Sequence, residues 1–203
     1  MVTILYKWYT SIMLLLGSRL INTPIMGLQT GTQLAVTKNP IIDPSNLTII
    51  GYEINGPMLS ERPSFIRIAD VRELSDVGMI IDSNDEFIGI KDVVAIEKIY
   101  KLGFNLLGIV VIDESKRKLG KVSDYSIDID SFTITQLNVS RGVIKSLTET
   151  ELLVHRSQIV EINNSAIIVR STTKKLDPII QPSQLSYLNP FRSTTTQIDN
   201  KDL

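Results

Sequence analysis

Two stretches of the chain repeat one pattern, and this repeat constrains the fold more than any other feature of the sequence. Leu152–Arg170 (LLVHRSQIVEINNSAIIVR) aligns with Phe65–Asp82 (FIRIADVRELSDVGMIID), with Glu161 over Glu73. In this alignment Ile66 meets Val154, and each copy reads as an apolar run, a short polar break and a second apolar run. Short apolar runs between polar breaks are typical of β-strands. The chain therefore contains a duplicated β-unit.

Both copies also change the phase of their hydrophobic alternation at the same place. In the first copy Leu47 and Ile49 alternate, and Tyr52 and Ile54 then alternate on the opposite phase. The second copy repeats these four positions, with the same spacing, at Phe132, Ile134, Leu137 and Val139. One extra residue in a strand sends the following side chains to the other face. We therefore expect a β-bulge in each copy.

Composition narrows the classes of function. The 203 residues are 43% hydrophobic and 21% charged, with a formal net charge of −1. A dedicated nucleic-acid binder usually carries a clear basic excess. The chain has no cysteine, which excludes thiolate metal sites, a cysteine nucleophile and disulfides, and its single histidine argues against a His-based metal site or a conventional triad. Because no catalytic constellation is present, we expect no enzymatic activity, no metal site and no cofactor.

The distribution of glycine and proline predicts a mainly β fold with two small tandem β-barrels joined by a short α-helix. These residues punctuate short apolar runs, as they do in small barrels and sandwiches. The predicted parts are a leader (1–13), a first barrel (14–84), a helical linker (85–103), a second barrel (104–170) and a disordered tail (171–203). Apolar residues at helical spacing place the helix at Lys91–Leu102, with Gly103 as its C-terminal cap. We expect this helix to cover a barrel face or to pack between the two units.

The beginning of the chain is apolar. Met1–Leu16 (MVTILYKWYTSIMLLL) carries one charge, Lys7, and lacks the basic start and small-residue cleavage site of a signal peptide. Its polar interruptions also argue against a membrane span. We interpret it as a poorly ordered leader that runs into a first strand. Two alternatives are translation starting at Met13 and a membrane-surface anchor.

The end of the chain has a different character. Ser171–Leu203 contains three prolines and many Ser and Thr residues, with no hydrophobic periodicity. Such a segment buries too little surface to offset its ordering entropy, so we expect it to be disordered. Its one apolar patch is Tyr187–Phe191 (YLNPF), which is either a docking motif or a segment that folds back on the barrel.

Two motifs of the second half resemble a known family. Lys118–Asp124 (KLGKVSD) is similar to the "LGKV-x-D" strand of the PRC-barrel family, the small β-barrel found in the H subunit of the photosynthetic reaction centre and in the ribosome maturation factor RimM. Leu152–Val169 resembles the segment that closes this barrel, where a "DIVEI"-like run precedes a final apolar strand. Gln158 stands where an aspartate is common, whereas the first half has Asp70 at the equivalent position and Ala35 in place of the signature glycine.

The resemblance implies a non-enzymatic interaction module. Members of the family bind protein partners, including ribosomal proteins, or regulate electron transfer from a membrane-surface position. For this chain it implies a cytoplasmic adaptor for protein partners, in a setting such as ribosome maturation or RNA processing, with no small-molecule substrate. The alternative is a peripheral membrane protein anchored through its apolar N-terminus, with the basic hairpin facing lipid.

Two groups of residues are candidate contacts for partners. The strongest charge cluster is Lys116, Arg117, Lys118 and Lys121, in an expected hairpin turn. It would contact phosphate oxygens of RNA or lipid, or it is a solvated hairpin tip. Candidate contacts for a protein partner are Arg72, Glu73, Tyr187 and Phe191. We expect Arg72 and Glu73 either to pair locally or to face a partner.

The remaining polar residues have structural interpretations. Asp124, Asp128 and Asp130 alternate along a predicted strand and should share its wet face, but they lack the glycine and terminal glutamate of a calcium loop. We expect Asp43 to be a turn residue. We expect His155 to be a surface residue or a residue with its hydrogen bonds satisfied.

Overall fold

The structure is a computed structural model that describes residues 13–57, 59–141, 151–163 and 165–171. The predictions for the leader, the disordered tail and the Tyr187–Phe191 motif therefore lie outside the described residues, apart from Met13 and Ser171.

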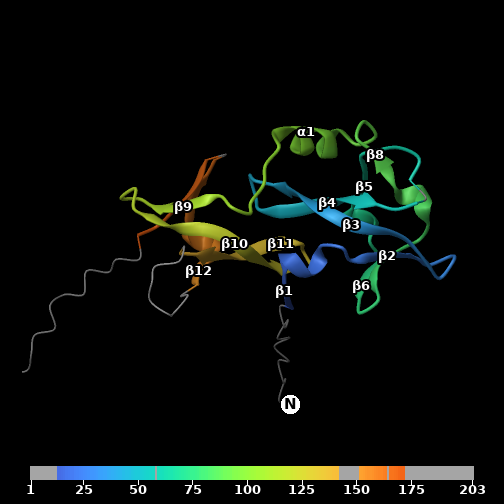
Figure 1. Cartoon of the computed structure of the whole chain (residues 1–203), viewed down its shortest axis with the longest axis horizontal. Helices are drawn as coiled ribbons and strands as arrows, with labels where there is room; N and C mark the ends of the chain where they lie inside the picture. The colour runs from blue at the N-terminus through green and yellow to red at the C-terminus, as the bar shows by residue number, and fades with distance from the viewer. Residues whose placement is uncertain (1–12, 58, 142–150, 164, 172–203) are drawn as a thin grey trace, which may run out of the picture. The chain divides into compact units, whose positions relative to one another are not determined.

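The described chain is mainly β (Figure 1). The strands of the first half are β1 (Leu14–Leu16), β2 (Pro24–Gly27), β3 (Thr32–Asp43), β4 (Thr48–Asn55), β5 (Ser64–Arg67), β6 (Glu73–Ser75), β7 (Gly78–Ile81) and β8 (Ile88–Gly89). Those of the second half are β9 (Val110–Asp113), β10 (Lys118–Asp128), β11 (Thr133–Ser140), β12 (Leu152–His155), β13 (Ile159–Ile162) and β14 (Ala166–Val169). The helices of the described residues are α1 (Val94–Leu102) and the short 3-10 turns η1 (Gly17–Leu20), η2 (Ile68–Asp70), η3 (Asn84–Glu86) and η4 (Arg156–Gln158).

The two halves have the same strand order. Hydrogen bonds join β5-β4-β3-β2-β7-β6 in the first half and β12-β11-β10-β9-β14-β13 in the second. The first and last hairpins of the first half are β2–β3 and β6–β7, and those of the second half are β9–β10 and β13–β14. In each half these two hairpins are joined by a parallel strand pair, β2 with β7 and β9 with β14. The duplicated β-unit is therefore confirmed at the level of topology.

The described strands form one open sheet rather than two separate closed barrels. Thr48 of β4 pairs with Thr133 of β11, and this contact joins the halves into a 14-stranded sheet whose path ends at β13 and β6. A buried core also runs through both halves, with Tyr52 and Met79 from the first and Leu137 and Val154 from the second. The mainly β fold is confirmed, whereas closure into tandem barrels is not.

The predicted bulges are present at equivalent positions. The β3–β4 register skips Ile50, and the β10–β11 register skips Thr135, which is the residue that aligns with Ile50 in the repeat. As a result Ile49 and Tyr52 both face the core, with exposed fractions of 1% and 0%, although they are three positions apart in one strand. An odd spacing would otherwise place two strand residues on opposite faces.

Helix α1 covers part of the sheet, as predicted, but it begins at Val94 rather than Lys91. The delay has a local cause, because the Asp92 carboxylate accepts a hydrogen bond from the Gly89 N–H and holds a turn there. Gly103 ends the helix in the left-handed conformation, with φ of 61°, as expected of a C-terminal cap. On its inner face Ile96 packs into a small apolar cluster with Ile41 of β3 and Phe65 of β5.

The N-terminal element of each half lies on the other half. Strand β1 precedes the first copy, yet it pairs with β10 of the second copy, with Leu14 opposite Asp128. Helix α1 precedes the second copy and packs on the first (Figure 1). The assignment of Leu14–Leu16 to the first barrel is therefore wrong. The chain can lie on β10 because Gly17, directly after β1, leaves room for the ring of Tyr125.

Within the described part of the chain, no helix is both long enough and apolar enough to cross a membrane.

Candidate functional site

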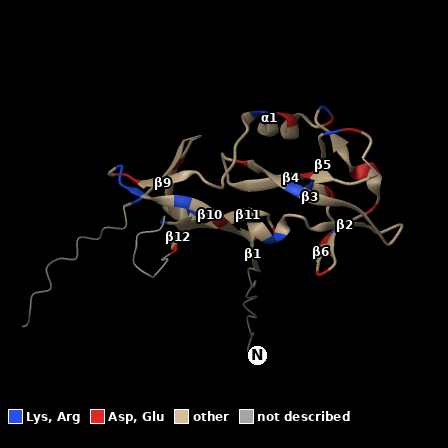
Figure 2. Cartoon of the chain, in the orientation of Figure 1, with Lys and Arg blue, Asp and Glu red and all other residues tan. Residues whose placement is uncertain are grey.

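The basic cluster lies at the β9–β10 hairpin, where Figure 2 shows Lys and Arg gathered near one end of the sheet. Arg117 serves the hairpin itself. Its N–H and Nε donate to the two carboxylate oxygens of Asp113 at 2.8 and 3.0 Å, and the Asp113 side chain is only 3% exposed. Lys116, Lys118 and Lys121 are exposed. All four predicted cations are therefore exposed, and one of them, Arg117, also pairs with a buried carboxylate.

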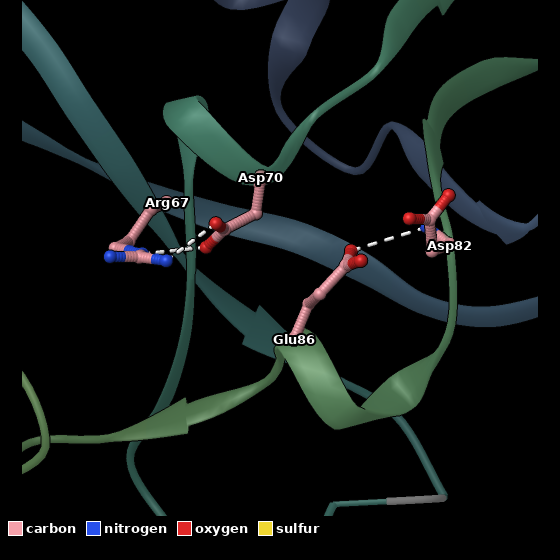
Figure 3. A network of polar contacts seen from close by, with 4 residues as sticks. All are labelled: Arg67, Asp70, Asp82 and Glu86. Atoms are coloured by element: carbon pink, nitrogen blue, oxygen red, sulfur yellow. Dashed lines mark hydrogen bonds and ion pairs between the residues drawn. The ribbon is translucent and has the colours of Figure 1, made fainter.

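Arg72 pairs locally, as one of its two interpretations predicted. It forms a two-pronged ion pair with Asp82, at the end of β7. Nearby, Arg67 donates through Nε and Nη2 to the carboxylate of Asp70 at 2.6 and 2.5 Å, and Glu86 of η3 accepts the Asp82 N–H at 3.2 Å (Figure 3). Arg72, Asp82 and Glu86 thus tie β7 to η3 and to the chain that follows η2, while the Arg67–Asp70 pair spans η2 itself.

This network changes the proton affinity of two carboxyl groups in opposite directions. The hydrogen bonds and charge of Arg72 hold the pKa of Asp82 below its ordinary value. Burial raises the pKa of Glu86, and the neighbouring negative charges of Asp82 and Asp70 add to the effect. Glu73, the other predicted partner contact, is an exposed residue of β6.

The predicted alternating carboxylates act as caps. Asp124 accepts hydrogen bonds from the N–H and hydroxyl of Ser18 at 3.2 and 2.6 Å, and so caps the first turn of η1. Asp128 accepts the Asp130 N–H and the Ser131 hydroxyl at 3.1 and 3.0 Å, which closes the turn after β10. Asp124 and Asp128 share a face of β10, but Asp130 lies beyond the strand, so the prediction of a face common to all three is wrong.

No group of three or more His, Cys, Asp or Glu side chains arranged to hold a metal ion occurs in the described part of the chain.

His155 has its hydrogen bonds satisfied, as predicted. It is the N-cap residue of η4. Its Nδ1 accepts the Ser157 N–H at 3.3 Å, and its backbone N–H donates to Gln158 Oε1 at 2.8 Å. The first copy places Arg67 and Asp70 at the two equivalent positions, where an ion pair spans the same turn. Equivalent turns are therefore held by His155 and Gln158 in the second copy and by the Arg67–Asp70 ion pair in the first.

Asp43 is the turn residue that was expected. Its Oδ1 accepts the N–H and the hydroxyl of Ser45 at 2.9 and 2.7 Å. Asp128, its counterpart in the second copy, closes its turn in the same way, with Ser131 as its hydroxyl donor. The two residues therefore close equivalent hairpins.

A pocket of about 650 Å³ lies where α1, the chain that follows it, β3 and η1 meet. Its walls are mostly apolar and include the aromatic rings of Tyr100, Phe104 and Tyr125. The polar residues that reach it are Ser18, Asn39, Glu53 and Asn105. Sequence reasoning missed this pocket because its residues come from segments far apart in the chain and form no motif.

Among the residues that the structure describes, Glu53 is the carboxylate that lines this pocket. Its Oε1 accepts from Lys38 Nζ at 2.8 Å and its Oε2 from Asn39 Nδ2 at 2.9 Å, and the side chain is 13% exposed. The lysine balances its charge. Burial also raises the pKa of Tyr125, so this phenol in the wall is neutral at ordinary pH.

A scan against protein-family models finds no match to this chain, and a search of curated proteins finds none either.

Proposed function

We propose that this chain is a non-catalytic adaptor of the PRC-barrel type, built from two PRC-barrel-like units, and that it binds protein partners in the cytoplasm. The observation that carries the proposal is the repeat. Both halves have the same strand order, and the β3–β4 and β10–β11 pairs carry their bulges at Ile50 and Thr135. Ribosome maturation and RNA processing are the settings that the family resemblance implies.

The residues that resemble the family motif have structural roles that are consistent with the proposal. Gly120 lies where a Cβ would meet the backbone oxygen of Ser140 at 2.3 Å, so the close approach of β10 and β11 requires glycine. The equivalent residue in the first half is Ala35, and here the residue without a side chain is Gly56, directly after β4. A Cβ on Gly56 would lie 3.1 Å from the Cβ of Ala35. Each half therefore has a glycine near this contact, Gly120 within β10 and Gly56 directly after β4.

The distribution of charge supports a binding role. Arg117, Asp124, Asp128 and His155 are engaged in hairpin or turn contacts. The exposed Lys116, Lys118 and Lys121 form the part of the basic cluster that we assign to an anionic partner surface. Ionic contacts of this kind weaken as salt rises.

Partner identification tests the proposal. The full chain with an affinity tag is cross-linked in native lysate at low and high salt, and the captured proteins are identified by mass spectrometry. We expect a stoichiometric protein partner that binds the purified chain again in isolation. Repeated recovery of the chain alone, or of proteins that do not rebind it, contradicts the proposal.

Charge-reversal variants then locate the contact. Changing Lys116, Lys118 and Lys121 to Glu should weaken rebinding and flatten its salt dependence. A matched control changes Lys91 and Lys98, two exposed lysines beside or on α1, to Glu. Equal loss in both variants would argue against the hairpin as the contact surface.

The peripheral-membrane alternative has one supporting observation. Met13, Leu14 and Leu16, directly after the apolar start of the chain, are 64%, 50% and 39% exposed. Deleting residues 1–12 should release such a protein from the membrane fraction of a lysate. An adaptor distributes in the same way with or without those residues.

A further inference from the structure

Gly17 and Gly103 are structurally equivalent, because the residues five positions further on, Asn22 and Gly108, donate N–H hydrogen bonds to the aligned residues Thr37 and Val122. Their surroundings are very different. Gly17 follows β1 and Gly103 follows α1, each just before the first strands of its half. A Cβ on Gly17 would lie 2.3 Å from Cε2 of Tyr125, because the tyrosine ring lies directly on the glycine. A Cβ on Gly103 would meet nothing within 4 Å. The same contact is filled in one copy and empty in the other.

One sequence difference accompanies this asymmetry at the position of Tyr125. The residue of β3 that aligns with Tyr125 in the repeat is Pro40, and its small ring leaves the space beside Gly103 open. Gly103 and Pro40 both line the pocket. The pocket is thus the site of a side-chain contact that the first copy of the repeat lacks.

A second contact is lost at the same place. Beside the filled contact, between Gly17 and Tyr125, Ser18 donates to Asp124. The equivalent pair in the open copy is Phe104 and Asn39, and Asn39 instead donates to Glu53 at 2.9 Å. In place of the Ser18–Asp124 hydrogen bond, this side of the pocket therefore has the ring of Phe104 and the Glu53 carboxylate that Asn39 holds. An apolar cavity with a few fixed polar groups is the usual construction of a small-molecule site.

The size and chemistry of the pocket define what fits. Its volume of about 650 Å³ lies inside the range of roughly 300–1,000 Å³ that is usual for small-molecule pockets. Aromatic walls from Phe104 and Tyr125 favour a flat, apolar molecule. The Glu53 carboxylate has about four acceptor positions, and the structure gives it two donors, from Lys38 and Asn39. Because Lys38 balances its charge, a neutral N–H or O–H donor suffices.

We propose that this pocket binds a flat, largely apolar, uncharged small molecule that carries a hydrogen-bond donor, with the donor directed at Glu53. The occupant takes the place that the Tyr125 ring fills in the other copy. This binding site goes beyond the adaptor role and does not depend on it. Binding there would act where the two halves meet, because the pocket wall joins Gly17 and Tyr125 to the chain that follows α1.

The first test uses N-phenyl-1-naphthylamine, an uncharged aromatic amine that fluoresces in apolar surroundings, with the full chain. We expect saturable binding of one probe per chain. Leu107→Trp places a large side chain at a 43% exposed position of the pocket wall and should raise Kd by about tenfold or more, a difference of the size expected when one good apolar contact is lost. Non-saturable fluorescence would overturn the proposal.

A matched variant controls for added surface hydrophobicity. Leu153→Trp makes the same exchange on β12, at a 53% exposed residue outside the pocket, and should leave Kd unchanged. Ile99→Trp, on the α1 side of the pocket, gives a second blocking variant if Leu107→Trp has an altered circular dichroism spectrum. Equal affinities for the blocking variants and the Leu153→Trp control would overturn the assignment to this pocket.

The donor is tested through the probe rather than the protein. The N-methylated analogue of the probe has no N–H, and the wild-type chain should bind it about two- to tenfold more weakly, the range expected for one lost hydrogen bond. Equal affinities for the two probes would overturn the role of Glu53.

Discussion

Ser18 and Asp124 are 106 residues apart in the chain, yet the serine hydroxyl donates to the aspartate carboxylate at 2.6 Å and the serine N–H does so at 3.2 Å. The bond fixes η1, which belongs to the first half by sequence, to β10 of the second half. Asp124 is also the aspartate of the stretch that resembles the "LGKV-x-D" strand. Its role here is to cap a turn brought to it from the other copy.

Removing this cap should destabilise the fold. We expect Asp124→Ala to lower the free energy of unfolding by about 1–2 kcal/mol, the range for a lost helix cap or a hydrogen bond to a charged group. Urea denaturation measures it. In a double-mutant cycle with Ser18→Ala, the two losses should be less than additive because they remove one interaction. Additive losses would contradict the coupling, and Asp130→Ala, at an exposed turn residue, serves as the control.

The β9–β10 hairpin should depend on Asp113 more than on its lysines. Asp113→Ala removes the buried acceptor of two Arg117 hydrogen bonds and should cost about 1–3 kcal/mol of unfolding free energy. Lys118→Ala, at an exposed position, should change it by less than about 0.5 kcal/mol. Thermal denaturation of both variants checks the contrast. Comparable losses would mean that the ion pair contributes little to the hairpin.

The positions of apolar residues along the strands predicted part of the fold correctly. The flip between Ile49 and Tyr52, and its repetition between Ile134 and Leu137, placed both bulges correctly, because burial on one face dictates strand register. Gly103 was placed as a helix cap because few other residues adopt its positive φ. Bulges and helix caps are determined by residues close together in the sequence, so the sequence alone is enough to predict them.

Pairings between distant segments could not be predicted in this way. The three leucines of β1 would suit an edge strand of either half, and two tertiary contacts favour β10, the packing of Gly17 under Tyr125 and the bonds from Ser18 to Asp124. The alternation that marked Asp124 as a wet strand residue was correct about its face but silent about Ser18. The pocket was missed for the same reason, although one signal was available, namely the exchange of Tyr125 for Pro40 between the copies.

The Arg72–Asp82 pair should make stability fall in acid. Because Arg72 lowers the folded pKa of Asp82, the contribution of this carboxylate is present above its unfolded pKa, near 3.8, and is lost as pH falls through the folded value. Urea denaturation from about pH 7 to about pH 2.5 should therefore show a smaller acid-side loss for Asp82→Asn than for the wild type. Identical pH profiles would contradict the pairing.

Glu86 should have the opposite effect. Its folded pKa is raised, so the folded state binds the proton more tightly than the unfolded state, whose value is near 4.5. Stability contributed by this group is present at low pH and is lost as pH rises through the folded pKa. Glu86→Gln should remove that loss, so its stability relative to the wild type should increase between about pH 4 and pH 7. A pH-independent difference would show that ionisation of Glu86 is not the cause.

The contact between Gly17 and Tyr125 gives the last prediction. A Cβ at position 17 would lie 2.3 Å from the tyrosine ring, so Gly17→Ala should force the ring or the backbone to move at a cost of about 1–3 kcal/mol in unfolding free energy. In a Tyr125→Leu background, where the smaller side chain leaves room, the same change should be nearly neutral. Urea denaturation of the two single variants and the double variant measures the difference. If Gly17→Ala is equally costly in both backgrounds, the ring is not what excludes a side chain there, and the explanation of the open pocket as its unfilled counterpart fails with it.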